Sequence, residues 1–142
     1  MIDYHLVRRK LSRLNMYLQK LEPIAKKTIE EYLDDDYLRF STERLIQLIV
    51  ECATDINNHV IVESGKHPPE DYRSSFIKAA EAGLMTRKLA EQIQGSAGMR
   101  NVLVHEYLDI DDKLVFAAIN LTLKYYGEYL KQVNNFIVKG EK

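Results

Sequence analysis

Hydrophobic residues recur every three or four positions along almost the whole chain, and this spacing constrains the fold more than any other feature. Such spacing places the apolar side chains on one face of an α-helix, which turns once every 3.6 residues. Glycine and proline, which interrupt helices, are scarce, with six Gly and three Pro among 142 residues. The sequence therefore predicts an all-α chain with long helices.

The spacing predicts four main helices and one short helix. The first carries an apolar stripe from Tyr4 to Leu21, and Pro23 is expected to bend or interrupt it. The second begins at the acidic run 34–36, because exposed N–H groups at a helix start favour negative charge. A short third helix covers residues 72–80 and ends near Gly83, since glycine is common just after a helix.

The last two helices flank the segment 98–107. Thr86 is expected to cap the fourth helix, which the glycine-containing stretch 95–98 should weaken or kink. The last helix starts after residues 109–112 and carries two adjacent apolar stripes. The first stripe comprises Leu114, Ala118, Leu121, Tyr125, Tyr129, Val133 and Phe136. The combined arc is wider than a bundle usually needs, so part of it is expected to face another chain.

These helices predict one domain over residues 1–142, an antiparallel four-helix bundle with a short extra helix. The apolar runs are too short for a transmembrane span, and the N-terminus has charges where a signal peptide needs an apolar segment. We therefore expect a cytoplasmic protein. The single cysteine, Cys52, can form neither an internal disulfide nor a thiolate metal site. The run Val102–Val104 is the one place where β-branched residues could instead form a strand.

The segment Gly98–Tyr107 carries the side chains with the clearest chemistry. Four residues separate Arg100 from His105, and Tyr107 follows two positions later. A guanidinium can hold a phosphate through two hydrogen bonds, and a histidine gains and loses protons near neutral pH. The pair would suffice to cleave RNA without a metal, because the ribose 2′-OH supplies the nucleophile. The alternative is a surface arginine and a histidine bonded within the bundle.

The motif Arg100-Asn101-x-Leu103-x-His105-x-Tyr107, in a helical chain of this length, resembles the HepT-like branch of the HEPN superfamily. That branch contains toxins of toxin–antitoxin pairs, and the resemblance covers nearly the whole chain. It implies a homodimeric, metal-independent endoribonuclease, without a cofactor, whose two chains line a shared cleft. It also implies an antitoxin partner, a minimal nucleotidyltransferase of the MntA type. By the same resemblance Arg100 and His105 are the catalytic pair, Asn101 supports them, and the partner adenylylates Tyr107.

The motif does not determine how Arg100 and His105 come together. On a continuous helix Arg100 and His105 point about 140° apart, at 100° per residue. The helix could break near His105, the arginine side chain could wrap around it, or two copies of the motif could complete each other across a two-fold axis.

Other candidate residues have a structural as well as a functional interpretation. Asp55 and His59 lie one helical turn apart and form either a proton-handling pair or an ordinary surface contact. The basic cluster Arg8–Lys10 with Arg13 is either a solvated helix face or part of an RNA track, if it lies beside the motif. The histidines show no metal-ligand spacing, and the chain lacks a glycine-rich phosphate loop.

Two further functions remain open beside the nuclease. The chain could be a non-catalytic helical subunit that supports a nucleotidyltransferase and uses the motif to hold a nucleotide. It could also be a purely structural dimerisation domain. RNA cleavage in excess chelator distinguishes the nuclease from both.

Overall fold

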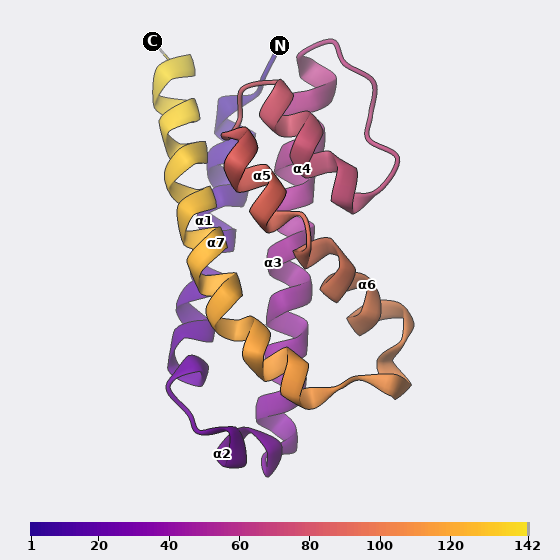
Figure 1. Cartoon of the computed structure of the whole chain (residues 1–142). Coiled ribbons are helices and arrows are strands. Elements are labelled where there is room, and N and C mark those ends of the chain that lie inside the picture. The colour runs from indigo at the N-terminus through magenta and orange to yellow at the C-terminus, as the bar shows by residue number, and fades with distance from the viewer. Residues whose placement is uncertain (142) are drawn as a thin grey trace.

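Three long helices form the frame of the molecule. The computed structural model describes residues 1–141, and the long helices are α1 (Tyr4–Ala25), α3 (Asp36–Glu63) and α7 (Asp112–Gly140). In Figure 1, α1 descends from the N-terminus while α3 and α7 ascend, so both termini lie at the same end of the molecule. The helix α1 packs against both α3 and α7.

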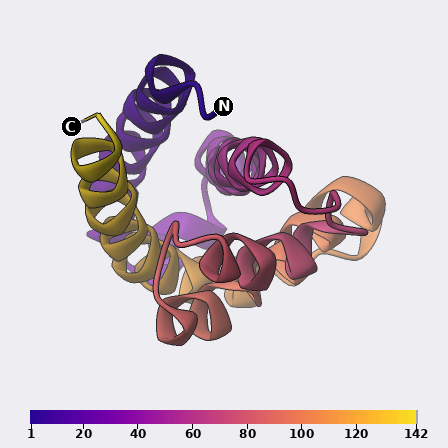
Figure 2. The ribbon, with the colours of Figure 1, turned by 90° about the horizontal axis from the view of Figure 1, so that it is seen from above.

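Shorter helices complete the bundle. The helices α5 (Arg87–Ile93) and α6 (Ser96–His105) descend in sequence, and α4 (Tyr72–Glu81) packs on α3 beside them. Seen from above, α6 diverges from α1 and α7 (Figure 2). It packs instead on α3 and α4. The all-α antiparallel bundle with a short extra helix is therefore confirmed, and the expected interruption near Gly95 divides the fourth main helix into α5 and α6.

The helix ends follow the capping residues in the sequence. Asp35 and Thr86 accept backbone N–H groups in the first turns of α3 and α5. Gly83 follows α4 with φ +92°, a conformation that side-chain-bearing residues rarely adopt. Pro23 lies in the last turn of α1, after which the short helix α2 (Ile29–Leu33) begins.

The core matches the predicted stripes of α1 closely and those of the other long helices in part. The stripe expected on α3 comprises Leu45, Leu48, Ile49, Cys52, Ile56 and Val60. Its last four members are buried, but the buried face is rotated toward Ile46 and Val50, so Leu45 and Leu48 are only half-buried. On α7 the second predicted stripe is buried at Val115, Ile119, Tyr126 and Ile137 and partly buried at Leu130. Leu114 and Leu121 of the first stripe are 61% and 52% exposed. The run 102–104 is helical rather than extended. Within residues 1–141 no helix is both long and apolar enough to span a bilayer.

A buried polar network fixes α4 against α3 and α7. The Tyr129 hydroxyl donates to Asn57 Oδ1 at 2.7 Å, and Asn57 Nδ2 donates to Ser75 Oγ at 3.1 Å. Each group would be costly to bury without a partner, so the network holds the three helices in one arrangement. It thereby positions Tyr72, at the start of α4, beside the motif.

Candidate active site

The motif occupies α6 and the short 3₁₀ helix η1 (Tyr107–Asp109). The helix α6 is continuous from Arg100 to His105 and ends there, because the Glu106 N–H makes the last helical bond, to Val102 O at 2.9 Å. The helix therefore breaks after His105 rather than between the two motif residues. A wrapped arginine and a site completed by a second copy are the two geometries that remain.

Arg100 is anchored by a carboxylate that sequence reasoning missed. Its Nε and Nη2 atoms lie 2.9 Å and 2.8 Å from one oxygen of Glu51 on α3. Gln47 Nε2 donates to the same oxygen at 3.0 Å. The Arg100 side chain is only 15% exposed, so this ion pair is shielded more than a typical surface pair. Glu51 thus fixes the guanidinium and offsets its charge.

Two further neighbours hold the same guanidinium. Its central carbon lies 4.3 Å from the centre of the Tyr72 ring, the geometry of a cation–π contact. Its Nη1 atom, which is not bonded to Glu51, donates to Asn101 Oδ1 at 3.3 Å. Asn101 therefore contacts Arg100 directly. Residues of α3, α4 and α6 together orient Arg100.

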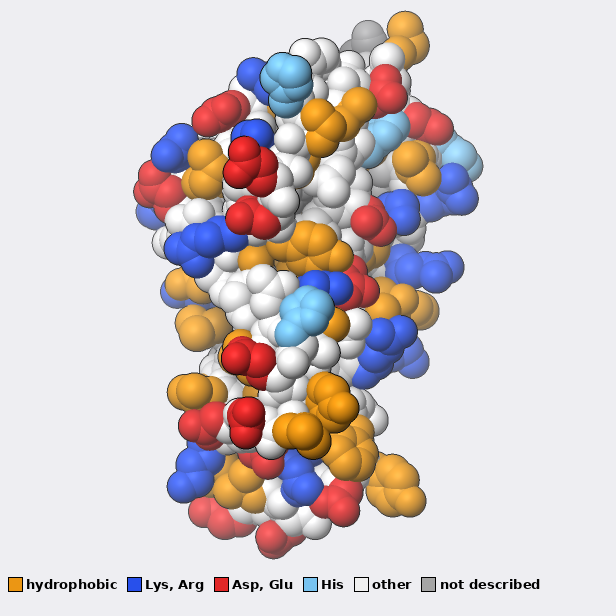
Figure 3. Space-filling view, turned by 90° about the vertical axis from the view of Figure 1, so that its right-hand side faces the viewer, with side chains coloured by type: hydrophobic (Ala, Val, Ile, Leu, Met, Phe, Trp, Pro, Cys, Tyr) orange, Lys and Arg blue, Asp and Glu red, His pale blue; other side chains and the backbone are white. Residues whose placement is uncertain are grey.

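His105 and Tyr107 lie at the surface. His105 is the exposed last residue of α6, and Tyr107, the first residue of η1, is 66% exposed. No hydrogen bond or ion pair within residues 1–141 joins either of them to Arg100. Figure 3 shows the side of the molecule that carries α6, where basic, acidic and histidine side chains meet near the middle and hydrophobic side chains gather below.

Asp55 and His59 each contact the N-terminal part of the chain. Asp55 forms an ion pair with Lys10 at 3.2 Å, and His59 Nε2 accepts a hydrogen bond from the Asp3 amide at 2.9 Å. These contacts tie α3 to α1 and favour the structural interpretation of both residues. Among residues 1–141, no cluster of three or more histidine, cysteine or acidic side chains has a metal-binding arrangement.

Cys52 lies between α1 and α3 and is buried. Its Sγ donates to the Lys10 carbonyl oxygen at 3.1 Å. Burial raises the pKa of the thiol to about 11, against smaller opposing effects of Lys10 and Arg13. Because the thiolate is the nucleophilic form, Cys52 is inert at neutral pH.

A helical bundle that carries an arginine–histidine motif on one surface helix defines a class of candidate RNA-cleaving domains. The sequence profile of the family described as Ribonuclease HepT-like matches residues 14–133 of this chain. A tRNA nuclease HepT from Aphanizomenon flos-aquae is 36% identical over 145 residues, covering 99% of this chain and 96% of that protein. The chain belongs to the HepT-like ribonuclease family.

Further relatives and solved structures share lower identity with this chain. An mRNA nuclease HepT from Shewanella oneidensis is 25% identical over 100 residues, covering 70% of this chain and 75% of that protein. A tri-AMPylated HEPN toxin from the same organism, solved with its MNT antitoxin, has a TM-score of 0.81 at 21% identity. The match covers 95% of this chain and 99% of that toxin chain. A toxin–antitoxin structure with AMP-PNP has a TM-score of 0.82 at 19% identity, covering 92% and 98%. These structures share the fold of this chain.

Proposed function

We propose that this protein is a metal-independent endoribonuclease toxin, with Arg100 and His105 as its catalytic residues. The observation that carries the proposal is the arrangement on α6. There a firmly oriented guanidinium and an exposed imidazole lie on one surface helix of a HepT-like ribonuclease chain. As a toxin acting on cellular RNA, the protein would work in the cytoplasm.

The two side chains divide the chemistry of transesterification. The His105 imidazole accepts the proton of the ribose 2′-OH, and O2′ attacks the adjacent phosphorus. Arg100 stabilises the negative charge that develops on the phosphorane oxygens. The bond from phosphorus to O5′ then breaks, and an imidazolium donates a proton to O5′. The products are a 2′,3′-cyclic phosphate and a 5′-hydroxyl, and no metal or cofactor takes part.

A homodimer would bring the two groups to one phosphate. Because Arg100 is bonded to α3 while His105 lies at the exposed end of α6, one chain does not bring the pair into contact. A two-fold axis beside α6 would place both copies of the motif around one cleft, and a second histidine could then serve as the acid. The exposure of Leu114 and Leu121 supports an apolar contact with another chain.

A nucleotidyltransferase antitoxin of the MntA type is the proposed partner. Two structures with the same fold are toxin–antitoxin complexes, and the toxin in one of them is AMPylated. Tyr107 is accessible to such an enzyme, since its side chain is 66% exposed and η1 holds it just after His105. Adenylate on its oxygen would add bulk and negative charge where RNA must approach Arg100.

Cleavage in the presence of a chelator tests the proposal. The purified chain is incubated with tRNA and with mRNA in excess EDTA, because relatives are named for both substrates. The proposal predicts cleavage of at least one RNA, and loss of that cleavage in Arg100→Lys, which keeps the charge but loses the planar guanidinium that Glu51 and Tyr72 orient. The alternative, a nucleotide-holding subunit, predicts nucleotide binding without cleavage.

A further inference from the structure

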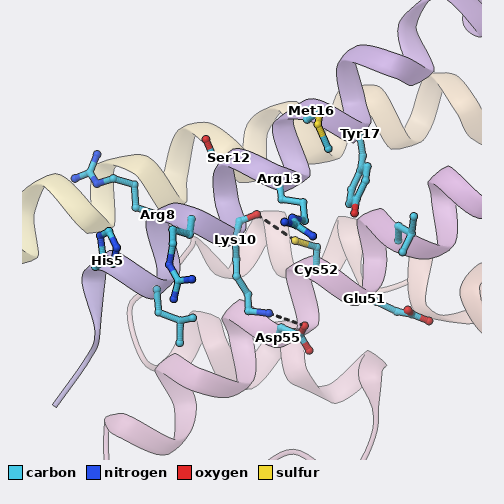
Figure 4. Close-up of a pocket in the computed structure, with 13 residues that line it drawn as sticks. His5, Arg8, Lys10, Ser12, Arg13, Met16, Tyr17, Glu51, Cys52 and Asp55 are labelled. Atoms are coloured by element: carbon cyan, nitrogen blue, oxygen red, sulfur yellow. Dashed lines mark hydrogen bonds and ion pairs between the residues drawn. The ribbon is translucent and has the colours of Figure 1, made fainter.

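A basic groove lies on the other side of Glu51 from Arg100. The groove has a volume of about 920 Å³ and runs between α1 and α3, and its walls include Arg9, Arg13 and Tyr17. Figure 4 shows Lys10, Arg13 and Tyr17 on α1, facing Glu51, Cys52 and Asp55 on α3. Glu51 lines this groove and also binds Arg100, so α3 connects the groove to the motif.

Only some of the basic side chains in the groove are paired with a carboxylate. Of its four Arg and Lys residues, Arg8 forms an ion pair with Glu141, and Lys10 forms one with Asp55. Arg9 and Arg13 form no hydrogen bond or ion pair with any residue in the range 1–141. The groove wall therefore presents two guanidinium groups whose charge no neighbouring carboxylate offsets directly.

The spacing of these two arginines suits a polyanion. They lie four residues apart on one face of α1, which separates them by about 6 Å along the helix axis. Tyr17 continues the same face one turn further and offers an aromatic ring for base stacking. Successive cations beside an aromatic side chain are typical of surfaces that follow a single-stranded nucleic-acid backbone.

We infer that the groove between α1 and α3 is a subsite for the RNA backbone, in which Arg9 and Arg13 bind phosphates of nucleotides flanking the cleaved bond. The inference rests on the proposed function, since it extends the path of the same substrate. A strand leaving the groove crosses the exposed side of α3 at Glu51, about one helix width or 10–12 Å, and reaches Arg100.

The test separates binding from catalysis. A double variant, Arg9→Gln with Arg13→Gln, is compared with Lys88→Gln plus Lys139→Gln, which removes the same charge from exposed positions outside this groove. All proteins carry His105→Ala for binding, measured by fluorescence anisotropy with a labelled tRNA transcript. The groove variant should bind about tenfold more weakly, and the slope of log K against log salt should fall by about 1–2. The control should stay within about twofold of the parent.

Kinetics with intact His105 provide the second readout. The groove variant should raise KM about tenfold with kcat within about threefold of wild type, because the groove holds flanking nucleotides and not the reacting phosphate. Equal RNA affinity and equal salt slope in the groove variant and the control would overturn the inference. A loss of RNA binding that accompanies dissociation of a dimer, seen by light scattering, would also overturn it. The same holds if the groove variant binds RNA normally and is defective only in binding the antitoxin. If wild-type protein cuts no RNA while the groove variant still weakens tRNA binding, the proposed function fails and the subsite stands.

Discussion

One oxygen of Glu51 accepts a hydrogen bond from Arg100 Nε at 2.9 Å and lies 2.8 Å from Nη2 in the same ion pair, so the guanidinium is held by one edge. This edge-on pair leaves Nη1, which contacts Asn101, as the nitrogen through which Arg100 can reach a phosphate. Glu51 is thus a positioning residue for the proposed chemistry.

Replacing Glu51 should disturb the orientation of Arg100 and therefore kcat. We expect Glu51→Ala to lower kcat by about 10–100-fold, since misplacing a reactive group by about 1 Å can cost 100-fold. Glu51→Gln keeps an acceptor oxygen at the same place and should restore most of the loss. Steady-state kinetics on RNA check both values. An Ala variant with the kcat of wild type would show that the pair serves only packing.

His105 and His59 provide a matched comparison. His105→Ala should reduce cleavage by roughly 10²–10⁴-fold, because the substitution removes one acid–base group. It should leave Tm unchanged, because the His105 side chain is exposed. His59→Ala should keep cleavage but lower the stability by about 1 kcal/mol, since the Asp3 amide loses its acceptor. Cleavage assays and thermal melts are run on both variants. An inactive His59 variant beside an active His105 variant would move the chemistry to α3.

Tyr107 should be the target of the antitoxin. Tyr107→Phe removes the oxygen that would carry adenylate but keeps the exposed ring. We expect this variant to retain much of its ribonuclease activity and to escape silencing by the partner nucleotidyltransferase. Mass spectrometry after co-expression should find the adenylate mass on the wild-type peptide containing Tyr107. Adenylate found only on a different tyrosine would refute the assignment.

Glu43 should make the stability of the fold depend on pH. Compared with a glutamine variant, the wild-type protein should be relatively more stable in mild acid than at neutral pH. Burial and then the nearby Asp112 raise the pKa of Glu43, and Arg39 opposes the shift only in part. A raised pKa in the folded state stabilises the fold below the unfolded pKa, and this contribution is lost as pH rises through the folded pKa. Glu43→Gln should therefore increase Tm at pH 7.5, with a smaller gain at pH 4.

Thermal melts of the Glu43 variant at the two pH values measure this difference. Glu22→Gln, at an exposed position of α1, is the matched control for loss of charge. A gain in Tm that is as large at pH 4 as at pH 7.5 would show that Glu43 does not titrate against Asp112.

A homodimer should be the active species. Light scattering at micromolar concentration is expected to give about twice the chain mass of 16.5 kDa. The reason is that no hydrogen bond or ion pair within residues 1–141 joins Arg100 to His105, so the proposed cleft would draw on the motifs of two chains. A strictly monomeric species that still cuts RNA would exclude a shared cleft.

Local patterns in the sequence were sufficient to predict most of the fold. The stripe of α1 is buried from Val7 to Leu21, the acidic run 34–36 begins α3, and Thr86 caps α5 as expected. The run Val102–Val104 shows the limit of propensity. Its β-branched residues are helical because Leu103 is buried and the backbone bonds of α6 continue through them.

The surroundings of the motif were harder to predict, because they depend on contacts between distant parts of the chain. Glu51 lies 49 residues before Arg100, and Tyr72 lies on a third helix, so no local spacing relates them to the motif. The rotation of α3 that points Glu51 toward α6 follows from the packing of Ile46 and Val50, not from periodicity alone. A carboxylate on the half-buried edge of a helix was the only available signal.

The chemistry of the RNA ends tests the central claim most directly. RNA is cut by wild-type protein in excess EDTA, and the termini are compared with those of a substrate carrying a 2′-deoxy sugar at the cleaved nucleotide. Transesterification by His105 and Arg100 predicts a 2′,3′-cyclic phosphate, a 5′-hydroxyl, and no cleavage of the deoxy substrate. A 3′-hydroxyl with a 5′-phosphate, or a deoxy substrate that is cut as fast as RNA, would contradict the account.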